Sequence, residues 1–401
     1  MADTGALTVL CIATYEKGHE FLRECKRQGC HVLLLTTDKL KEAAWPREAV
    51  DEFFYIARDI SREDLMKGVS HIARTHQLDR VVALDDYDVE TAAMLREHLR
   101  VPGMGETTAR YFRDKLAERT KARNQGVLVP DFVHVVNDAQ IRRFTETTPL
   151  PWILKPRSQA AAIGMKKIER AEELWPAIDA LGDRRSYYLL ERFVAGDVFH
   201  VDSIVWETHV VFQAMHRYGQ PPYQVAHGGG VFTTTSVAKD DPAWKALEKI
   251  NRDVLAVFGM VRGVAHTEFI QSAADHRFLF LETSARVGGA FIVDLVEAES
   301  GLNLWREWAK LEIAGEDGDY QAPPLRERYA GLVLTLARQP WPDTSLYRDD
   351  EIVLRVKKEH HAGLIVASPD QARVQQLLDQ YTGRFMQDFY ASEPAPDRPS
   401  G

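Results

Sequence analysis

The alternation of short apolar runs with helix-like segments in the first third of the chain most constrains the fold. Apolar runs occupy residues 7–14, 31–37 and 80–86, and the segments between them carry apolar residues at helical spacing. Strands that are separated by helices pair in parallel and form an open sheet. The pattern therefore predicts an α/β fold that begins with an open parallel, Rossmann-like sheet.

The third apolar run ends in an acidic cluster made of Asp85, Asp86 and Asp88. Ligands of open parallel sheets bind beyond the carboxyl ends of the strands, so these side chains are candidates for substrate contact. Acidic residues at the start of a helix are also stabilised by the helix dipole, which gives them a purely structural role. The sequence leaves both interpretations open.

Composition predicts a globular, cytoplasmic protein. The 401 residues carry a net charge of −9 and a pI near 5.9, which argues against nucleic acid or an anionic membrane as a partner. The three cysteines are too few for a disulfide framework. No window reaches the roughly 18 apolar residues of a membrane span, and the first residues lack the pattern of a signal peptide.

Changes in composition predict the domain organisation. Proline and glycine interrupt the pattern near residues 101–107, and an acidic, proline-containing segment reads as a linker at residues 315–324. The predicted parts are an N-terminal α/β domain (1–105), a central region (106–325) with a small lid subdomain (about 127–190), a C-terminal α+β module (326–392) and a disordered tail (393–401).

A β-hairpin is predicted where an apolar strand ends in charged residues. VAHTEFI and FLFLE are strand-like and flank a turn near Asp275, a register that sets Glu268 opposite Glu282 and His266 opposite Ser284. Facing carboxylates beside apolar side chains are unfavourable, and a divalent cation such as Mg²⁺ would neutralise them. A slip of one residue, or pairing of Glu282 with a cationic side chain, is the alternative.

Two other segments suit a nucleotide. Lys155 ends an apolar strand and precedes a loop of small residues that closes at Gly164, which offers a point charge and accessible backbone amides to a polyphosphate. The segment lacks the P-loop pattern. Further along, Glu191 precedes an apolar turn and is a candidate acceptor for an adenine amino group, with the backbone of Phe193 and Val194 at the ring edge.

Five elements, in order over roughly residues 9–301, together resemble the ATP-grasp superfamily of the carboxylate–amine ligase type. Asp114 and Lys115 followed by GVLVP look like the helix that carries the first nucleotide lysine, and ILKP with its loop looks like the second lysine and the phosphate loop. ERFVAGD looks like the adenine hinge. GVAHTEF and FLETSARVGG resemble the paired metal-binding strands that usually read ExNxRxGG, and EAESGLNL resembles the helix that closes that region.

The resemblance implies an ATP-grasp central region, with its lid subdomain, between the N-terminal sheet and the C-terminal module. It implies that ATP lies between two sheets with Lys115 and Lys155 on its phosphates. Mg²⁺, or alternatively Mn²⁺, would be held by Glu268 and Glu282. Arg286 would stabilise charge on the transferred phosphoryl group and on the tetrahedral intermediate.

The sequence departs from the superfamily pattern at three places. Ser284 stands where asparagine is usual and is the third candidate metal ligand, since a hydroxyl can coordinate the metal or hold a water. The phosphate loop has alanines where glycines are common. Asp197 is the candidate for the ribose contact, although the acidic residue expected after the hinge does not align cleanly.

Two glycine-containing segments are candidates for substrate contact. His227 stands beside three glycines that begin at Gly228, where a backbone can approach a small ligand closely. An ordinary loop with a hydrogen-bonded histidine explains the same residues. Gly288 and Gly289 suit a similar role near the acyl phosphate, the intermediate that the resemblance implies.

The resulting prediction is an ATP-dependent ligase that activates a carboxylic acid as an acyl phosphate and couples it to an amine, giving ADP and phosphate. A bicarbonate-activating carboxylase of the same superfamily is one alternative, although the chain shows no biotinyl motif. A nucleotide-binding regulatory protein without turnover is the other. The expected partners are small acids and amines, with neither nucleic acid nor membrane, and a homodimer is compatible with the sequence.

Overall fold

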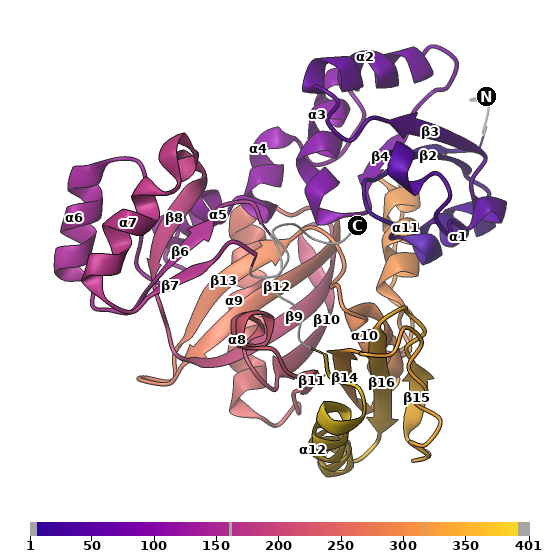
Figure 1. The fold of residues 1–401 in the computed structure, drawn as a ribbon. Helices are drawn as coiled ribbons and strands as arrows, with labels where there is room; N and C mark the ends of the chain where they lie inside the picture. Colours follow the sequence, from indigo (N-terminus) through magenta and orange to yellow (C-terminus); the bar gives the residue numbers. More distant parts are fainter. Residues whose placement is uncertain (1–5, 160–162, 317, 392–401) are drawn as a thin grey trace.

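The chain begins with an open parallel sheet, as the alternation of strands and helices predicted. The computed structural model describes residues 6–159, 163–316 and 318–391 (Figure 1). The first sheet has the strand order β3-β2-β1-β4 and contains β1 (Thr8–Ala13), β2 (His31–Thr37), β3 (Glu52–Ile56) and β4 (Arg80–Ala83). All of its pairings are parallel. The sequence analysis did not predict β3, whose side chains are only partly buried.

Helix α1 (His19–Arg27) connects β1 to β2, helix α2 (Arg62–Ile72) connects β3 to β4, and helix α3 (Val89–Leu99) follows β4. Helix α1 contributes Phe21 and Leu22 to a core that also contains Val9 and Leu34 of the sheet. The same core extends to Trp308, a residue of a later helix, because that helix packs on α1. The N-terminal sheet and the central region therefore share buried apolar surface.

A small antiparallel sheet forms the lid subdomain, at the left of Figure 1. Its strand order is β5-β8-β6-β7, with β5 (Phe132–His134), β6 (Trp152–Pro156), β7 (Lys166–Ile168) and β8 (Tyr188–Arg192). Helices α6 (Asp138–Thr147) and α7 (Leu174–Asp179) pack on it through a separate apolar core. The alanines predicted to cradle phosphate, residues 160–162, lie outside the described residues.

The largest sheet has eight antiparallel strands in the order β13-β12-β9-β10-β11-β14-β16-β15. The strands are β9 (Gly196–Trp206), β10 (His209–Tyr218), β11 (Phe232–Ser236), β12 (Gly263–Ser272), β13 (Phe278–Ser284), β14 (Tyr329–Leu336), β15 (Ile352–Arg355) and β16 (His361–Ser368). The remaining α-helices are α4 (Glu106–Ala109), α5 (Lys115–Asn124), α8 (Pro222–Gly228), α9 (Pro242–Phe258), α10 (Ile292–Ser300), α11 (Leu304–Ala314) and α12 (Gln371–Asp388).

The C-terminal strands continue the central sheet. Strand β14 pairs with β11, so the segment predicted as a separate C-terminal module extends the same hydrogen-bonded ladder. The sequence did not reveal this pairing because the two strands are distant in the chain. The predicted disordered tail, 393–401, lies outside the described residues. No helix among the described residues is long and apolar enough to cross a membrane.

Candidate active site

The predicted hairpin register is correct. Strands β12 and β13 are antiparallel, and Glu268 pairs with Glu282 while His266 pairs with Ser284. The register shifts by one residue directly after Glu268, at a β-bulge. Both glutamates line one cavity. The two carboxylates that the sequence placed on one face therefore do meet at one site.

That cavity has a volume of about 350 Å³ and lies between the lid sheet and the central sheet. Its walls include five apolar side chains, those of Ile153, Met165, Val198, Ile270 and Leu281. The predicted residues found in its lining are Lys115, Lys155, Glu191, Phe193, Val194, Glu268 and Glu282. An apolar slot that carries a few convergent charges is typical of a cofactor or nucleotide site.

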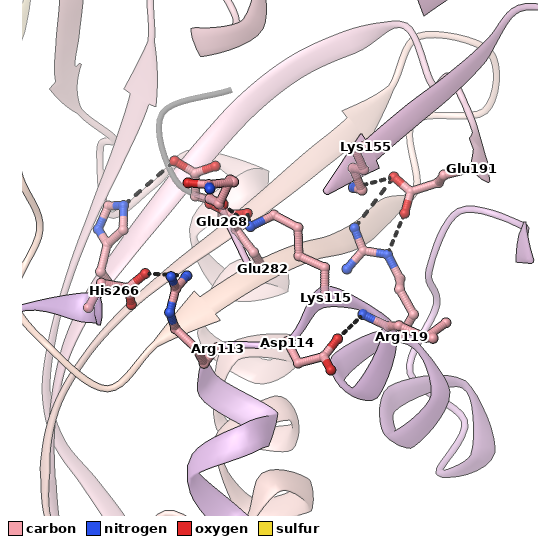
Figure 2. Close-up of polar contacts among 12 residues, drawn as sticks. Arg113, Asp114, Lys115, Arg119, Lys155, Glu191, His266, Glu268 and Glu282 are labelled. Atoms are coloured by element: carbon pink, nitrogen blue, oxygen red, sulfur yellow. Dashed lines mark hydrogen bonds and ion pairs between the residues drawn. The ribbon is translucent and has the colours of Figure 1, made fainter. Parts of the chain in front are cut away.

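Lys115 reaches the cavity from the first residue of α5. Asp114 caps this helix, because its side chain accepts hydrogen bonds from the backbone N–H groups of Leu116 and Ala117. The Lys115 Nζ donates to the backbone oxygen of Gln159 at 2.8 Å and lies 2.7 Å from Glu282 Oε2 (Figure 2). Burial alone would lower the pKa of Lys115, but the Glu282 carboxylate raises it, so the lysine stays charged.

Lys155 shares a buried counter-ion with an arginine that the sequence analysis missed. Glu191 Oε1 accepts from Lys155 Nζ at 2.8 Å, and Glu191 Oε2 accepts from Arg119 Nε at 2.7 Å (Figure 2). Burial alone would raise the pKa of Glu191, but Arg119 and Lys155 outweigh burial and hold it below its usual range. Burial lowers the pKa of Lys155 to about 8.

These contacts change the role expected of Glu191. The sequence suggested a free acceptor for an adenine amino group, whereas both carboxylate oxygens are occupied by buried cations. Glu191 lines the cavity and holds Lys155 in place. Arg119 follows Lys115 by one helical turn, a spacing that puts both on the same helix face. That spacing was the available signal for Arg119.

Glu268 belongs to a buried polar network. Tyr218 donates its hydroxyl to Glu268 Oε1 at 2.7 Å. Asp202 lies between two imidazoles, with Oδ1 2.9 Å from His266 Nδ1 and Oδ2 2.7 Å from His200 Nδ1. Burial alone would lower the pKa of His266, but Asp202 raises it to about 9. The alternation of His200 and Asp202 on β9 is the signal that could have identified this network.

Arg286 follows β13 in the loop that leads to α10. Its side chain is 15% exposed, and its Nη1 donates to the backbone oxygen of Val287 at 2.9 Å. Neither Arg286 nor Ser284, which is buried, is among the residues that line the cavity. At the end of this loop, Ala290 and Phe291 adopt φ values of 50° and 63°. Such left-handed backbone is costly for non-glycine residues and concentrates at functional sites.

Comparisons with known proteins agree with this geometry. No protein-family model matches the chain. It is 24% identical to an L-arginine-specific L-amino acid ligase of Bacillus subtilis over 267 residues, which are 65% of this chain and 64% of that relative. The chain thus spans just under two thirds of this relative's length.

Solved structures share the whole fold. An L-amino acid ligase from Bacillus licheniformis superposes with a TM-score of 0.74 at 17% identity, over 97% of this chain and 100% of that chain. An N5-carboxyaminoimidazole synthetase from Staphylococcus aureus complexed with ADP gives 0.71 at 15% identity, over 94% and 96%. The chain shares the fold of these ATP-grasp proteins. Its mixed α/β architecture is the ATP-grasp fold.

Three further residues that the sequence analysis assigned to the site, Asp197, His227 and Gly228, do not line the cavity. Asp197 is exposed, because its neighbours Gly196 and Val198 line the cavity and alternate strand residues face opposite ways. His227 and Gly228 are also exposed and do not line it. The cavity is lined instead by the residues that begin α8, Pro222, Tyr223 and Gln224. His227 stacks on Tyr223, with ring centroids 4.3 Å apart.

Gly288 and Gly289 occupy different surroundings. A Cβ on Gly288 would lie 3.0 Å from Asp202 Oδ1 and 2.7 Å from Ile292, so only glycine fits without displacement. Apart from Gly289 and its two chain neighbours, no described residue has a heavy atom within 4 Å of the position for a Cβ on Gly289. The first glycine therefore packs against the His266–Asp202 network, and the second borders open space.

The donor set fits Mg²⁺. Glu268 and Glu282 offer two carboxylates from facing strands, and Glu282 is only partly buried. Mg²⁺ is usually held by one or two carboxylates together with water and phosphate oxygens. Ser284 pairs with His266 next to them and offers a hydroxyl where the ATP-grasp pattern has an amide. The chemistry of these groups agrees with a metal bound together with a nucleotide.

Glu118, a residue of α5, is an unexpected carboxylate that interacts electrostatically with Lys115 and Glu282. It is 1% exposed, and its Oε2 has no hydrogen-bond partner among the described residues. Burial raises the pKa of Glu118 to about 8, with the charge of Glu282 adding to this effect and that of Lys115 opposing it. Glu118 is therefore mostly protonated at neutral pH.

Replacement of Glu118 by glutamine is expected to stabilise the protein increasingly as the pH rises from 5 to 8. An unfolded glutamate loses its proton near pH 4.5, whereas folded Glu118 keeps it until about pH 8, so the parent loses stability as pH rises through this window. Glu118→Gln removes that loss, on the order of 4 kcal/mol by pH 8. Melting curves from pH 5 to 8 measure the gain. The exposed Glu146→Gln variant is the control, and parallel curves for Glu118→Gln and the parent would contradict the assignment.

Proposed function

We propose that this protein is an ATP-dependent ligase that joins a carboxylic acid to an amine and releases ADP and phosphate. The observation that carries the proposal is the meeting of two facing glutamates, Glu268 and Glu282, with two lysines from separate elements, Lys115 and Lys155, in one cavity. This set supplies positive charge for phosphates and hard oxygen ligands for a divalent cation.

The nucleotide would occupy the cavity between the lid sheet and the central sheet. The apolar walls suit the adenine ring, with the backbone of Phe193 and Val194 at its edge. Lys155, held by Glu191, and Lys115 would contact the phosphates. Lys115 would exchange Glu282 for phosphate, since the same carboxylate is the candidate metal ligand. Mg²⁺ bound at Glu268 and Glu282 would neutralise charge on the β- and γ-phosphates.

The reaction would proceed in two displacements. An oxygen of the acid carboxylate attacks the γ-phosphorus, and the β–γ bridging oxygen leaves with ADP, which gives an acyl phosphate. The amine nitrogen then attacks the acyl carbon, the C–O bond to phosphate breaks, and the amine loses a proton as the amide forms. Arg286 would stabilise charge on the transferred phosphoryl group and on the tetrahedral intermediate. Catalysis would rest on positioning and electrostatics.

Amino acids are the proposed substrates. The Bacillus subtilis relative is an L-amino acid ligase, and so is the protein from Bacillus licheniformis that shares the fold. The likeness to an N5-carboxyaminoimidazole synthetase keeps bicarbonate as the alternative acid. The homodimer and the cytoplasmic location remain predictions.

A product assay tests the proposal. Purified protein with ATP and Mg²⁺ is incubated with pooled L-amino acids, and ADP, phosphate and new condensation products are quantified by mass spectrometry. We expect ADP and a dipeptide in equal amounts, both dependent on the pool. ADP release that needs bicarbonate instead would favour a carboxylase. Nucleotide binding without ADP release under either condition would indicate a regulatory protein and contradict the proposal.

A further inference from the structure

None of the described residues of the N-terminal domain, 6–105, lines the nucleotide cavity. One side chain of this domain nevertheless lies against the proposed catalytic arginine. Asp86 follows β4, at the carboxyl end of the parallel sheet, and its Oδ1 is 3.9 Å from Arg286 Nε. The sequence left open whether the acidic cluster contacts substrate or has a structural role. Asp86, one of its members, has a third environment and lies against Arg286.

The three carboxylates of that cluster have separate partners. Asp88 accepts from the backbone N–H and the hydroxyl of Thr14 at 2.8 and 2.9 Å, which is a structural contact within the domain. Asp85 pairs with Lys17 and accepts from the backbone N–H of Tyr87. Only Asp86 is ion-paired with residues beyond the N-terminal domain.

Asp86 stands between two arginines from different parts of the chain. Its Oδ2 accepts from Arg113 Nη1 at 3.0 Å, and the Arg113 guanidinium lies 4.5 Å from the centre of the Tyr87 ring. Arg113 directly precedes Asp114 and the nucleotide helix α5. One carboxylate therefore contacts both the start of the helix that carries Lys115 and the loop that carries Arg286.

The contact between Asp86 and Arg286 is incomplete. Asp86 Oδ1 and Arg286 Nε are both buried and both lack a hydrogen-bond partner among the described residues. Their separation of 3.9 Å exceeds a hydrogen bond by roughly 1 Å. Buried donors and acceptors are nearly always paired, because leaving them unpaired costs free energy. A small movement that joins these two atoms is therefore favourable.

We propose that Asp86 is a positioning residue that orients the Arg286 guanidinium toward the transferred phosphoryl group. This inference rests on the proposed function for the role of Arg286. A hydrogen bond from Nε to Asp86, with Nη1 held by Val287, fixes the plane of the guanidinium. A fixed donor plane aimed at developing charge is what makes such electrostatic stabilisation effective. The N-terminal domain thereby acts on the chemistry without touching the nucleotide.

Nucleotide affinities test the inference without a ligation assay. Asparagine at position 86 can still accept from Arg113 but removes the charge that faces Arg286. We expect Asp86→Asn to weaken binding of β,γ-imido-ATP with Mg²⁺ about tenfold, while ADP affinity changes less than about twofold, because only the γ-phosphate reports on Arg286. Calorimetry measures both affinities. The matched control is Asp88→Asn, which removes another buried carboxylate of the same turn. This control is expected to leave the ratio of β,γ-imido-ATP affinity to ADP affinity unchanged.

A double-mutant cycle separates positioning from a general loss of structure. The Arg286→Lys variant lacks the Nε donor. In this background, Asp86→Asn is expected to cause no further fall in the ratio of β,γ-imido-ATP affinity to ADP affinity. Three outcomes would overturn the inference. They are an equal loss of both affinities, additive effects in the cycle, and an unchanged ratio of the two affinities in an Asp86 variant that folds. If Asp86→Asn does not fold, the second variant is Asp86→Glu, which keeps the carboxylate but displaces it from Arg286 Nε by one methylene and is expected to weaken β,γ-imido-ATP binding more than ADP binding. If Asp86→Asn lowers the ratio of β,γ-imido-ATP affinity to ADP affinity but the protein ligates no substrate, the proposed function is contradicted. The orientation of Arg286 by Asp86 is then still supported.

Discussion

Glu282→Ala is expected to lower the rate of ADP formation by about three orders of magnitude or more. Glu282 faces Glu268 across the hairpin, and one carboxylate without the other gives a divalent cation a much weaker site. The loss corresponds to about 4 kcal/mol of transition-state stabilisation, which is in the range attributed to a metal ion at a phosphoryl group. Initial rates at saturating ATP, measured over a Mg²⁺ series, check the prediction.

The same variant is expected to stay folded. Glu282 is partly buried and its charge neutralises Lys115, but Lys115 keeps its hydrogen bond to the backbone oxygen of Gln159. A lower melting temperature with an unchanged circular dichroism spectrum is the expected signature. Asp275→Ala, at the exposed turn of the same hairpin, is the control and should keep the parent rate. A Glu282→Ala variant with the parent rate would refute the metal assignment.

Arg286→Ala is expected to lower kcat by about two to four orders of magnitude, the range seen when a preorganised donor to a developing charge is removed. ADP affinity is expected to change little, since Arg286 does not line the nucleotide cavity. Single-turnover formation of ADP, with acid present and amine absent, isolates the first displacement. A loss confined to KM for ATP would contradict the role of Arg286 in the transition state.

Arg286→Lys refines that prediction. Lysine keeps the positive charge but lacks the planar fork and the Nε donor that faces Asp86, so only a small part of the activity is expected to return. Arg277→Ala, an exposed arginine on the same hairpin that pairs with Asp275, is the control. Full recovery in the lysine variant would mean that charge alone suffices and that geometry at this position is unimportant.

Much of the nucleotide site could be predicted from local pattern. Alternation along two strands fixed which side chains share a face, and the short turn between the strands fixed their register, so Glu268 was set opposite Glu282 correctly. The end of an apolar run located Lys155, and this signal lies within a few residues of the side chain. Lys115 was assigned only through the resemblance to the ATP-grasp superfamily.

Other features of the site depend on segments that are distant in sequence. No local pattern reveals that Arg119 and Lys155 share Glu191, because the three residues come from α5, β6 and β8. The same limit explains why Glu191 was expected to be free to accept from adenine. Asp197 and His227 were chosen for residue type and position in a motif, and the path of the chain turns both toward solvent.

The sequence by itself determined the parallel α/β start and the hairpin with its paired glutamates, because periodicity and turn chemistry act over a few residues. The resemblance to the ATP-grasp superfamily supplied the order of the remaining elements. Only the tertiary structure decided which charges meet. It paired Lys115 with Glu282, set Asp86 between Arg113 and Arg286, and joined the C-terminal strands to the central sheet. Such contacts depend on how distant segments pack, and burial then decides which ionisable groups keep their charge.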